Sequence, residues 1–218
     1  MARVEMTYYV DALSSWCLIA EDAIARVRSE FGDALSFEWR IAQLREPFGY
    51  TQEQLAWYYR RTHSLTGVQL NAAWLTSTAD GSVQANRAAE AARSLGCSDD
   101  RARLAIARGA MLDGKRTCEA DVAAEVAAAA AGLDRTALRK KMDEPSTAEK
   151  IRESSGAFAA LNVQVRPTFV LKNGIGDSAV LSGCWRYEVL RAAIAGLADD
   201  ENAYRSFIAS SPPPAGAK

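Results

Sequence analysis

Residues 8–20 read YYVDALSSWCLIA, and this segment predicts the passage from a strand to a helix on which the fold depends. Residues 5–11 are rich in Thr, Tyr and Val, a composition typical of a buried strand. Helical spacing of apolar residues follows, at Cys17, Ala20, Ile24, Val27 and Phe31. At the junction, Ser14-Ser15-Trp16-Cys17 has the spacing of a redox Cys-x-x-Cys motif with a hydroxyl in place of the first sulfur.

The overall composition excludes several classes of protein. The 218 residues include 27 acidic and 26 basic side chains, so no net field attracts nucleic acid or an anionic membrane. Residues 1–7 pass directly into a strand pattern, and no later run is long enough to cross a bilayer. We therefore expect a cytoplasmic protein that binds neither nucleic acid nor membranes.

The cysteines and the single histidine limit the available chemistry. In the cytoplasm thiols are kept reduced, so Cys17, Cys97, Cys118 and Cys184 are not expected to form a disulfide framework. Their spacing fits neither a zinc knuckle nor an intact redox pair. His63 alone cannot build a multi-histidine metal site, and its basic neighbours indicate a helix end. We expect no metal site.

The remaining sequence predicts a second strand, a long helical stretch and a hairpin. Residues 35–41 alternate with period two, which completes a β-α-β unit with parallel strands. Helical patterns then extend to about residue 161. They include capping boxes at Thr51-x-x-Gln54 and Ser146-x-x-Glu149, and alanine-rich helices at 83–95, 99–112 and 118–131, the last ending at Gly132.

The strand pattern returns near the end of the chain. Residues 168–171 and 179–182 are predicted to form an antiparallel hairpin with a tight turn at Asn173-Gly174. A closing helix is expected at 187–197, with a short helical piece at 201–209.

The order of elements predicts an α/β protein with a thioredoxin fold, β-α-β … β-β-α, interrupted by an all-helical domain. We place the thioredoxin-like domain at 1–45 plus 162–209 and the inserted helical domain at 46–161. Residues 210–218, which contain three consecutive prolines, are expected to form a disordered tail.

Three motifs in this order resemble the DsbA-like thioredoxin superfamily. They are Asp-x-x-Ser-x-Trp-Cys at 11–17, Val-x-Val-x-Pro-Thr-Phe-Val at 163–170, and Ser-Gly followed by Tyr-Glu-Val-Leu within 182–190. The chain is most similar to the FrnE-type branch, which is related to 2-hydroxychromene-2-carboxylate isomerases and kappa-class glutathione transferases. The resemblance extends to about residue 198.

The resemblance implies roles for several residues. Pro167 is expected to be a cis-proline that faces the start of the first helix, next to a segment that pairs with a peptide-like ligand. Cys17 has the position of the resolving thiol of a redox pair. Ser14 matches the serine that holds the sulfur of glutathione in the isomerase and transferase branches. Glutathione is therefore the implied cofactor, and related proteins suggest a homodimer.

Other residues are expected to line the ligand site. Ser182 and Arg186 are candidates to contact a carboxylate, although Trp185 stands where those branches usually have an acidic residue for the γ-glutamyl group of glutathione. Trp16 either lines the cleft or anchors the helical domain. At least one of the aromatic residues Trp57, Tyr58, Tyr59 and Trp74 is expected to border the groove between the domains.

Arg166, next to Pro167, has two alternative interpretations. Its guanidinium either adds a positive charge beside Ser14 and Cys17 and selects an anionic ligand, or turns outward into water.

Three functions remain open from the sequence. The first is a DsbA-family oxidoreductase or isomerase-like protein that acts on a small thiol or peptide-like substrate, with Ser14 and Cys17 as its catalytic residues. The second is a glutathione-dependent isomerase or transferase. The third is a binding module that keeps the thioredoxin fold without chemistry, in which Ser14 is only a helix cap and Cys17 a small buried side chain.

Overall fold

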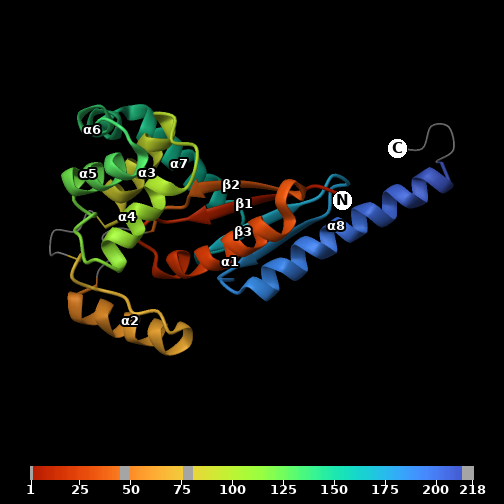
Figure 1. Ribbon diagram of the computed structural model, residues 1–218, viewed down its shortest axis with the longest axis horizontal. Helices are drawn as coiled ribbons and strands as arrows, with labels where there is room; N and C mark the ends of the chain where they lie inside the picture. The colour runs from red at the N-terminus through yellow and green to blue at the C-terminus, as the bar shows by residue number, and fades with distance from the viewer. Residues whose placement is uncertain (1, 45–49, 76–80, 213–218) are drawn as a thin grey trace.

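A four-stranded mixed sheet lies at the centre of the protein, which a computed structural model describes over residues 2–44, 50–75 and 81–212 (Figure 1). The strands are β1 (Val4–Val10), β2 (Leu35–Ile41), β3 (Thr168–Lys172) and β4 (Ser178–Ser182), in the order β2-β1-β3-β4. Strand β1 pairs parallel with β2 and antiparallel with β3, and β3 pairs antiparallel with β4. This topology confirms the predicted α/β thioredoxin fold.

Alternate residues of β1 face opposite layers of helix. Tyr8 is fully buried, stacks on Phe169 of β3 at 5.0 Å, and donates a hydrogen bond to the Cys17 carbonyl of α1 (Ser15–Phe31). Helix α8 (Tyr187–Ser210) packs beside α1. The next residue, Tyr9, points the other way and meets Phe158 of α7 (Pro145–Ala159) at 5.6 Å. The period-two alternation of a strand therefore places helices on both faces of the sheet.

Between β2 and β3 the described residues form six helices, which lie at one end of the sheet (Figure 1). The others are α2 (Gln52–Thr66), α3 (Val83–Ser94), α4 (Arg101–Met111), α5 (Ala120–Ala131) and α6 (Arg135–Asp143). Small alanine side chains form much of their interior, which lets the helices approach closely. The alanine run in α5 ends as predicted at Gly132, which adopts φ +67° as the helix cap.

The structure corrects three predicted details. The β3–β4 hairpin has a five-residue loop, 173–177, because the Asn173 side chain accepts hydrogen bonds from the Ile175 and Asp177 amides. Helix α7 begins at Pro145 rather than after a Ser146 cap, since proline suits a first helical position. Helix α8 is continuous through residue 210, so that residue belongs to a helix and not to the expected tail; residues 213–218 lie outside the described chain.

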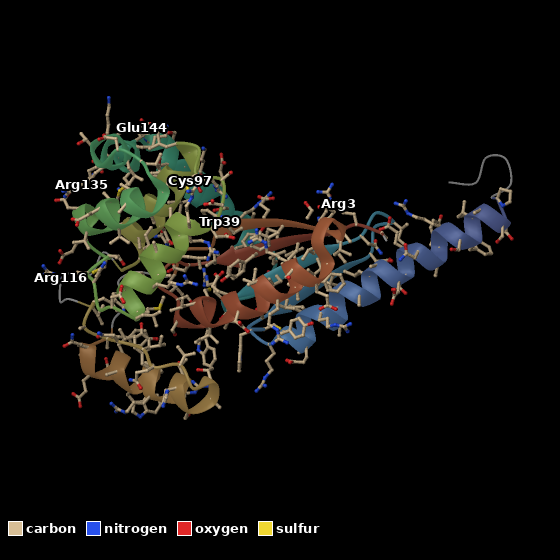
Figure 2. All side chains as sticks on the ribbon, viewed as in Figure 1. Arg3, Trp39, Cys97, Arg116, Arg135 and Glu144 are labelled. Carbon is tan, nitrogen blue, oxygen red and sulfur yellow. The ribbon has the colours of Figure 1, made fainter. Side chains whose placement is uncertain are left out.

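Trp39 of β2 lies where the sheet meets the inserted helices (Figure 2). The Arg93 guanidinium of α3 stacks 4.3 Å from the centre of the Trp39 ring and donates to the Trp39 carbonyl at 2.8 Å. This contact joins the middle of the edge strand to the inserted helices.

A buried carboxylate makes the second connection. Asp11, directly after β1, accepts from the amides of Leu13 and Leu44 and from the side chains of Ser82 and Asn86. Asn86 of α3 in turn accepts from the Ala12 amide at 2.9 Å. The ends of β1 and β2 are thus tied to the inserted helices by one hydrogen-bonded network that is closed to solvent.

Replacing Asn86 with alanine should lower the free energy of unfolding by about 2–3 kcal/mol. The change leaves the buried Ala12 amide without its acceptor and removes a donor from the Asp11 carboxylate, and each loss costs about 1–3 kcal/mol. Urea unfolding of Asn86→Ala and of the neighbouring control Arg87→Ala measures the difference. Equal stabilities for the two variants would contradict this account of the network.

Candidate functional site

A cleft of about 460 Å³ opens between the start of α1 and helix α2. The described residues that line it are Leu13, Ser14, Ser15, Trp16, Leu44, Tyr50, Leu55, Tyr58, Tyr59, Arg61, Thr62, Trp74 and Leu75. One wall therefore comes from the thioredoxin-like part and the other from the inserted helices. The prediction that an aromatic residue of the inserted segment borders the groove is confirmed.

Ser14 is the cap of α1 and also a wall of the cleft. Its backbone is extended (φ −81°, ψ 116°), and its Oγ accepts a hydrogen bond from the Cys17 amide at 3.4 Å. A hydroxyl that accepts one bond still has its proton to donate. Capping and ligand binding are therefore compatible in this side chain, next to the positive end of the helix dipole.

Cys17 lies one turn further along α1, and its side chain is in the hydrophobic core. Only 1% of the residue is exposed, and it is not among the described residues that line the cleft. Burial raises the pKa of its thiol to about 11, outweighing the hydrogen bond from Ser14, which acts in the opposite direction. At neutral pH this thiol is protonated and shielded, the opposite of a reactive redox cysteine.

Arg166 lies half-buried between the residues that follow β2 and the Phe158 ring. Its peptide bond to Pro167 is cis, and its guanidinium donates to the carbonyls of Ala42 and Gln43, each at 2.7 Å. The same group lies 4.3 Å from the centre of the Phe158 ring. Burial lowers the pKa of Arg166, while the nearby Asp11 and Cys17 act to raise it. Backbone carbonyls that follow β2 thus hold the guanidinium near Asp11 and Cys17, and Arg166 is not among the described cleft-lining residues.

The loop between β4 and α8 reaches α1 through two tryptophans. The Trp16 and Trp185 rings lie 5.8 Å apart, and the Arg186 guanidinium lies 4.5 Å from the Trp185 ring centre. Ser182 accepts a hydrogen bond from the Thr168 hydroxyl at 3.1 Å, and neither Ser182 nor Arg186 is among the described cleft-lining residues. Among the predicted site residues, the cleft wall therefore brings together Ser14 and Trp16.

Sequence reasoning missed Arg61 as a residue of the site. The sequence presented it only as part of a basic helix end, yet Leu55, Tyr58, Tyr59 and Thr62 recur at helical spacing and line the cleft with it. That period would have placed Arg61 near the same face. His63 is exposed and does not belong to the described cleft lining.

The model of the DSBA-like thioredoxin domain matches residues 5–195. The chain belongs to this family. A putative protein disulfide isomerase from Nitrosomonas europaea is similar in structure, with a TM-score of 0.75, 15% identity, and coverage of 93% of this chain and 98% of that one. No curated protein matches the sequence.

Two further solved structures share the fold. The cytosolic disulfide reductase DsbM from Pseudomonas aeruginosa, solved with GSH, has a TM-score of 0.67 and 22% identity over 93% of this chain and 97% of its own. A 2-hydroxychromene-2-carboxylate isomerase has a TM-score of 0.65 and 16% identity over 92% and 98%. Structures similar to this fold therefore include a disulfide reductase and an isomerase.

Two searches of the described residues were negative. In the ranges 2–44, 50–75 and 81–212, no helix is long and apolar enough to cross a membrane. The same ranges hold no group of three or more His, Cys, Asp or Glu side chains placed to bind a metal ion.

The raised pKa of Cys17 predicts a loss of stability in alkali. An unfolded thiol ionises near pH ~8.5, whereas the folded Cys17 keeps its proton to about 11, so rising pH favours the unfolded state. Relative to Cys17→Ala, the native protein should lose about 2 kcal/mol of unfolding free energy between about pH 8 and pH 10. Urea unfolding at a series of pH values gives this difference, and parallel pH profiles for both proteins would disprove the assignment.

Proposed function

We propose that this protein binds a small thiol in the cleft and holds its sulfur at Ser14, with glutathione as the first candidate ligand. The observation that supports this most strongly is the contrast between the two residues of the Ser-x-x-Cys motif. The Ser14 hydroxyl lines the cleft, whereas the Cys17 thiol is buried and has a raised pKa. The chemistry of such a site depends on the sulfur of the ligand rather than on a sulfur of the protein.

The proposed role of Ser14 follows from its place at the N-terminus of α1. Its hydroxyl donates to the ligand sulfur, and the unpaired amides and dipole of the helix stabilise negative charge there. Both effects lower the pKa of the bound thiol and so increase the fraction of thiolate at neutral pH. A thiolate is the nucleophile required for conjugation or for thiol-assisted isomerisation.

Glutathione-dependent isomerisation or conjugation is the reaction class that agrees best with this site. The folds of an isomerase and of a disulfide reductase solved with GSH are both similar to this chain, which is consistent with a thiol ligand. Disulfide exchange requires an accessible thiolate, and Cys17 offers none at neutral pH. A binding module without chemistry is the outcome if no thiol binds.

The native protein should be a poor dithiol oxidoreductase. Insulin reduction in the presence of dithiothreitol is expected near background, because the exposed position of the motif holds a hydroxyl. Ser14→Cys should raise the rate, since it restores a sulfur at the helix N-terminus where a thiolate is stabilised. Strong activity of the native protein that persists in Cys17→Ala would rule out this interpretation.

Calorimetric titration with reduced glutathione tests the thiol site directly. We expect weak binding that Ser14→Ala reduces about tenfold to a hundredfold, the range of one charge-assisted hydrogen bond of about 1.5–3 kcal/mol. Ser14→Asp separates this role from capping, because aspartate caps a helix well and repels a thiolate. Unchanged affinity in both variants would refute the role of Ser14, and a null titration of the native protein would favour a binding module.

A further inference from the structure

The charge pattern of the cleft indicates a narrower class of ligand than thiols in general. Arg61 lines the cleft from α2, on the wall opposite the start of α1. The described lining residues include no Asp, Glu or Lys. A ligand with a free carboxylate therefore meets a cation there, while an ammonium group meets no described counter-charge in the lining.

The guanidinium of Arg61 is available to a ligand, unlike others nearby. Arg166 is bound to backbone carbonyls, and Arg103 is buried against Glu21 and Asp100. Over residues 2–44, 50–75 and 81–212, no hydrogen bond or ion pair occupies the Arg61 side chain. Its planar fork of donors matches the two oxygens of a carboxylate.

The walls between Ser14 and Arg61 are mainly aromatic and aliphatic. Tyr58 contacts Tyr50 edge to face at 5.2 Å, and its ring is partly exposed on the cleft side of α2. The Tyr59 hydroxyl accepts a hydrogen bond from the Trp74 indole at 3.1 Å, so its polar end is satisfied within the protein. Trp16 forms part of the opposite wall. Such surfaces favour a flat apolar group.

We propose that, among small thiols, this cleft prefers an aromatic thiol that carries a carboxylate and no amine, and binds glutathione more weakly. Arg61 binds the carboxylate and Tyr58 packs against the ring. The placement of the sulfur at Ser14 rests on the proposed function above. A zwitterionic thiol such as glutathione is then a weaker ligand than an amine-free aromatic thiol acid.

Three probes separate these features in calorimetric titrations of the full chain. The probe 4-(mercaptomethyl)benzoate has the ring and the charge, 4-(mercaptomethyl)benzamide has the ring alone, and 3-mercaptopropionate has the charge alone. We expect the benzoate to bind most tightly, with the other two weaker by about fivefold to tenfold, between the range of an exposed ion pair and that of a bidentate one. The affinity for the benzoate should also fall as salt is added.

Matched variants assign the contributions to residues. Arg61→Gln should reduce benzoate affinity to that of the benzamide, whereas Arg60→Gln removes the same charge from a neighbouring exposed position outside the described lining and should have little effect. Tyr58→Leu should weaken both ring-bearing probes and leave 3-mercaptopropionate unchanged. Equal affinities for benzoate and benzamide, or equal losses in Arg61→Gln and Arg60→Gln, would overturn the inference, as would no saturable benzoate binding at millimolar concentration.

A fourth probe, 4-ethylbenzoate, distinguishes failure of the inference about Arg61 from failure of the proposed function. If it binds as well as the thiol and Ser14→Ala changes neither affinity, sulfur recognition is wrong while the carboxylate site at Arg61 stands. If Ser14→Ala weakens every thiol but charge has no effect, the proposed function stands and the inference about Arg61 falls.

Discussion

The buried carboxylate of Asp11 accepts hydrogen bonds from two backbone amides and from the side chains of Ser82 and Asn86. A buried charge is tolerated only when it is fully bonded, so the four donors must be held in fixed positions around it. Those donors lie just before α1, after β2 and at the start of α3. The Asp11 carbonyl also accepts from the Ser14 amide at 3.1 Å. The position of Ser14 at the cleft therefore depends on contacts from three separate parts of the chain.

The two ends of the Ser-x-x-Cys motif experience opposite environments within one turn of helix. Ser14 sits at the rim, where it caps α1 and faces the cleft, while Cys17 points into the apolar layer between helix and sheet. The helix dipole favours an anion at both places, but desolvation decides the outcome for the buried thiol. With oxygen in place of the first sulfur, neither residue of this motif presents a thiolate to the cleft at neutral pH.

Periodicity and family motifs predicted the order of strands and helices well, because β1, β2 and the alanine-rich helices carry strong local patterns. They failed where side-chain hydrogen bonds or tertiary packing set the local arrangement. The Asn173 side chain accepts hydrogen bonds from the Ile175 and Asp177 amides and so forms a longer hairpin loop than the Asn-Gly pair predicts. Arg61 was overlooked because helical spacing places it near the face of Tyr58, whereas the tertiary structure shows that this face lines the cleft.

Helix α2 stands apart from the other inserted helices, which pack together at the end of the sheet (Figure 1). Asp11 and Trp39 tie α3 to the strands, whereas α2 is hydrogen-bonded to the segment that follows it, through Gln52 to the Ala72 carbonyl and through Tyr59 to the Trp74 indole. One wall of the cleft is therefore built from the start of α1, beside the sheet, and the other from α2 together with Tyr50, Trp74 and Leu75. A displacement of α2 relative to α1 would change the width of the cleft, and its free energy would then be part of the affinity for a ligand. Ligand specificity would then depend on the free energy that holds α2 in place as well as on the residues that contact the ligand.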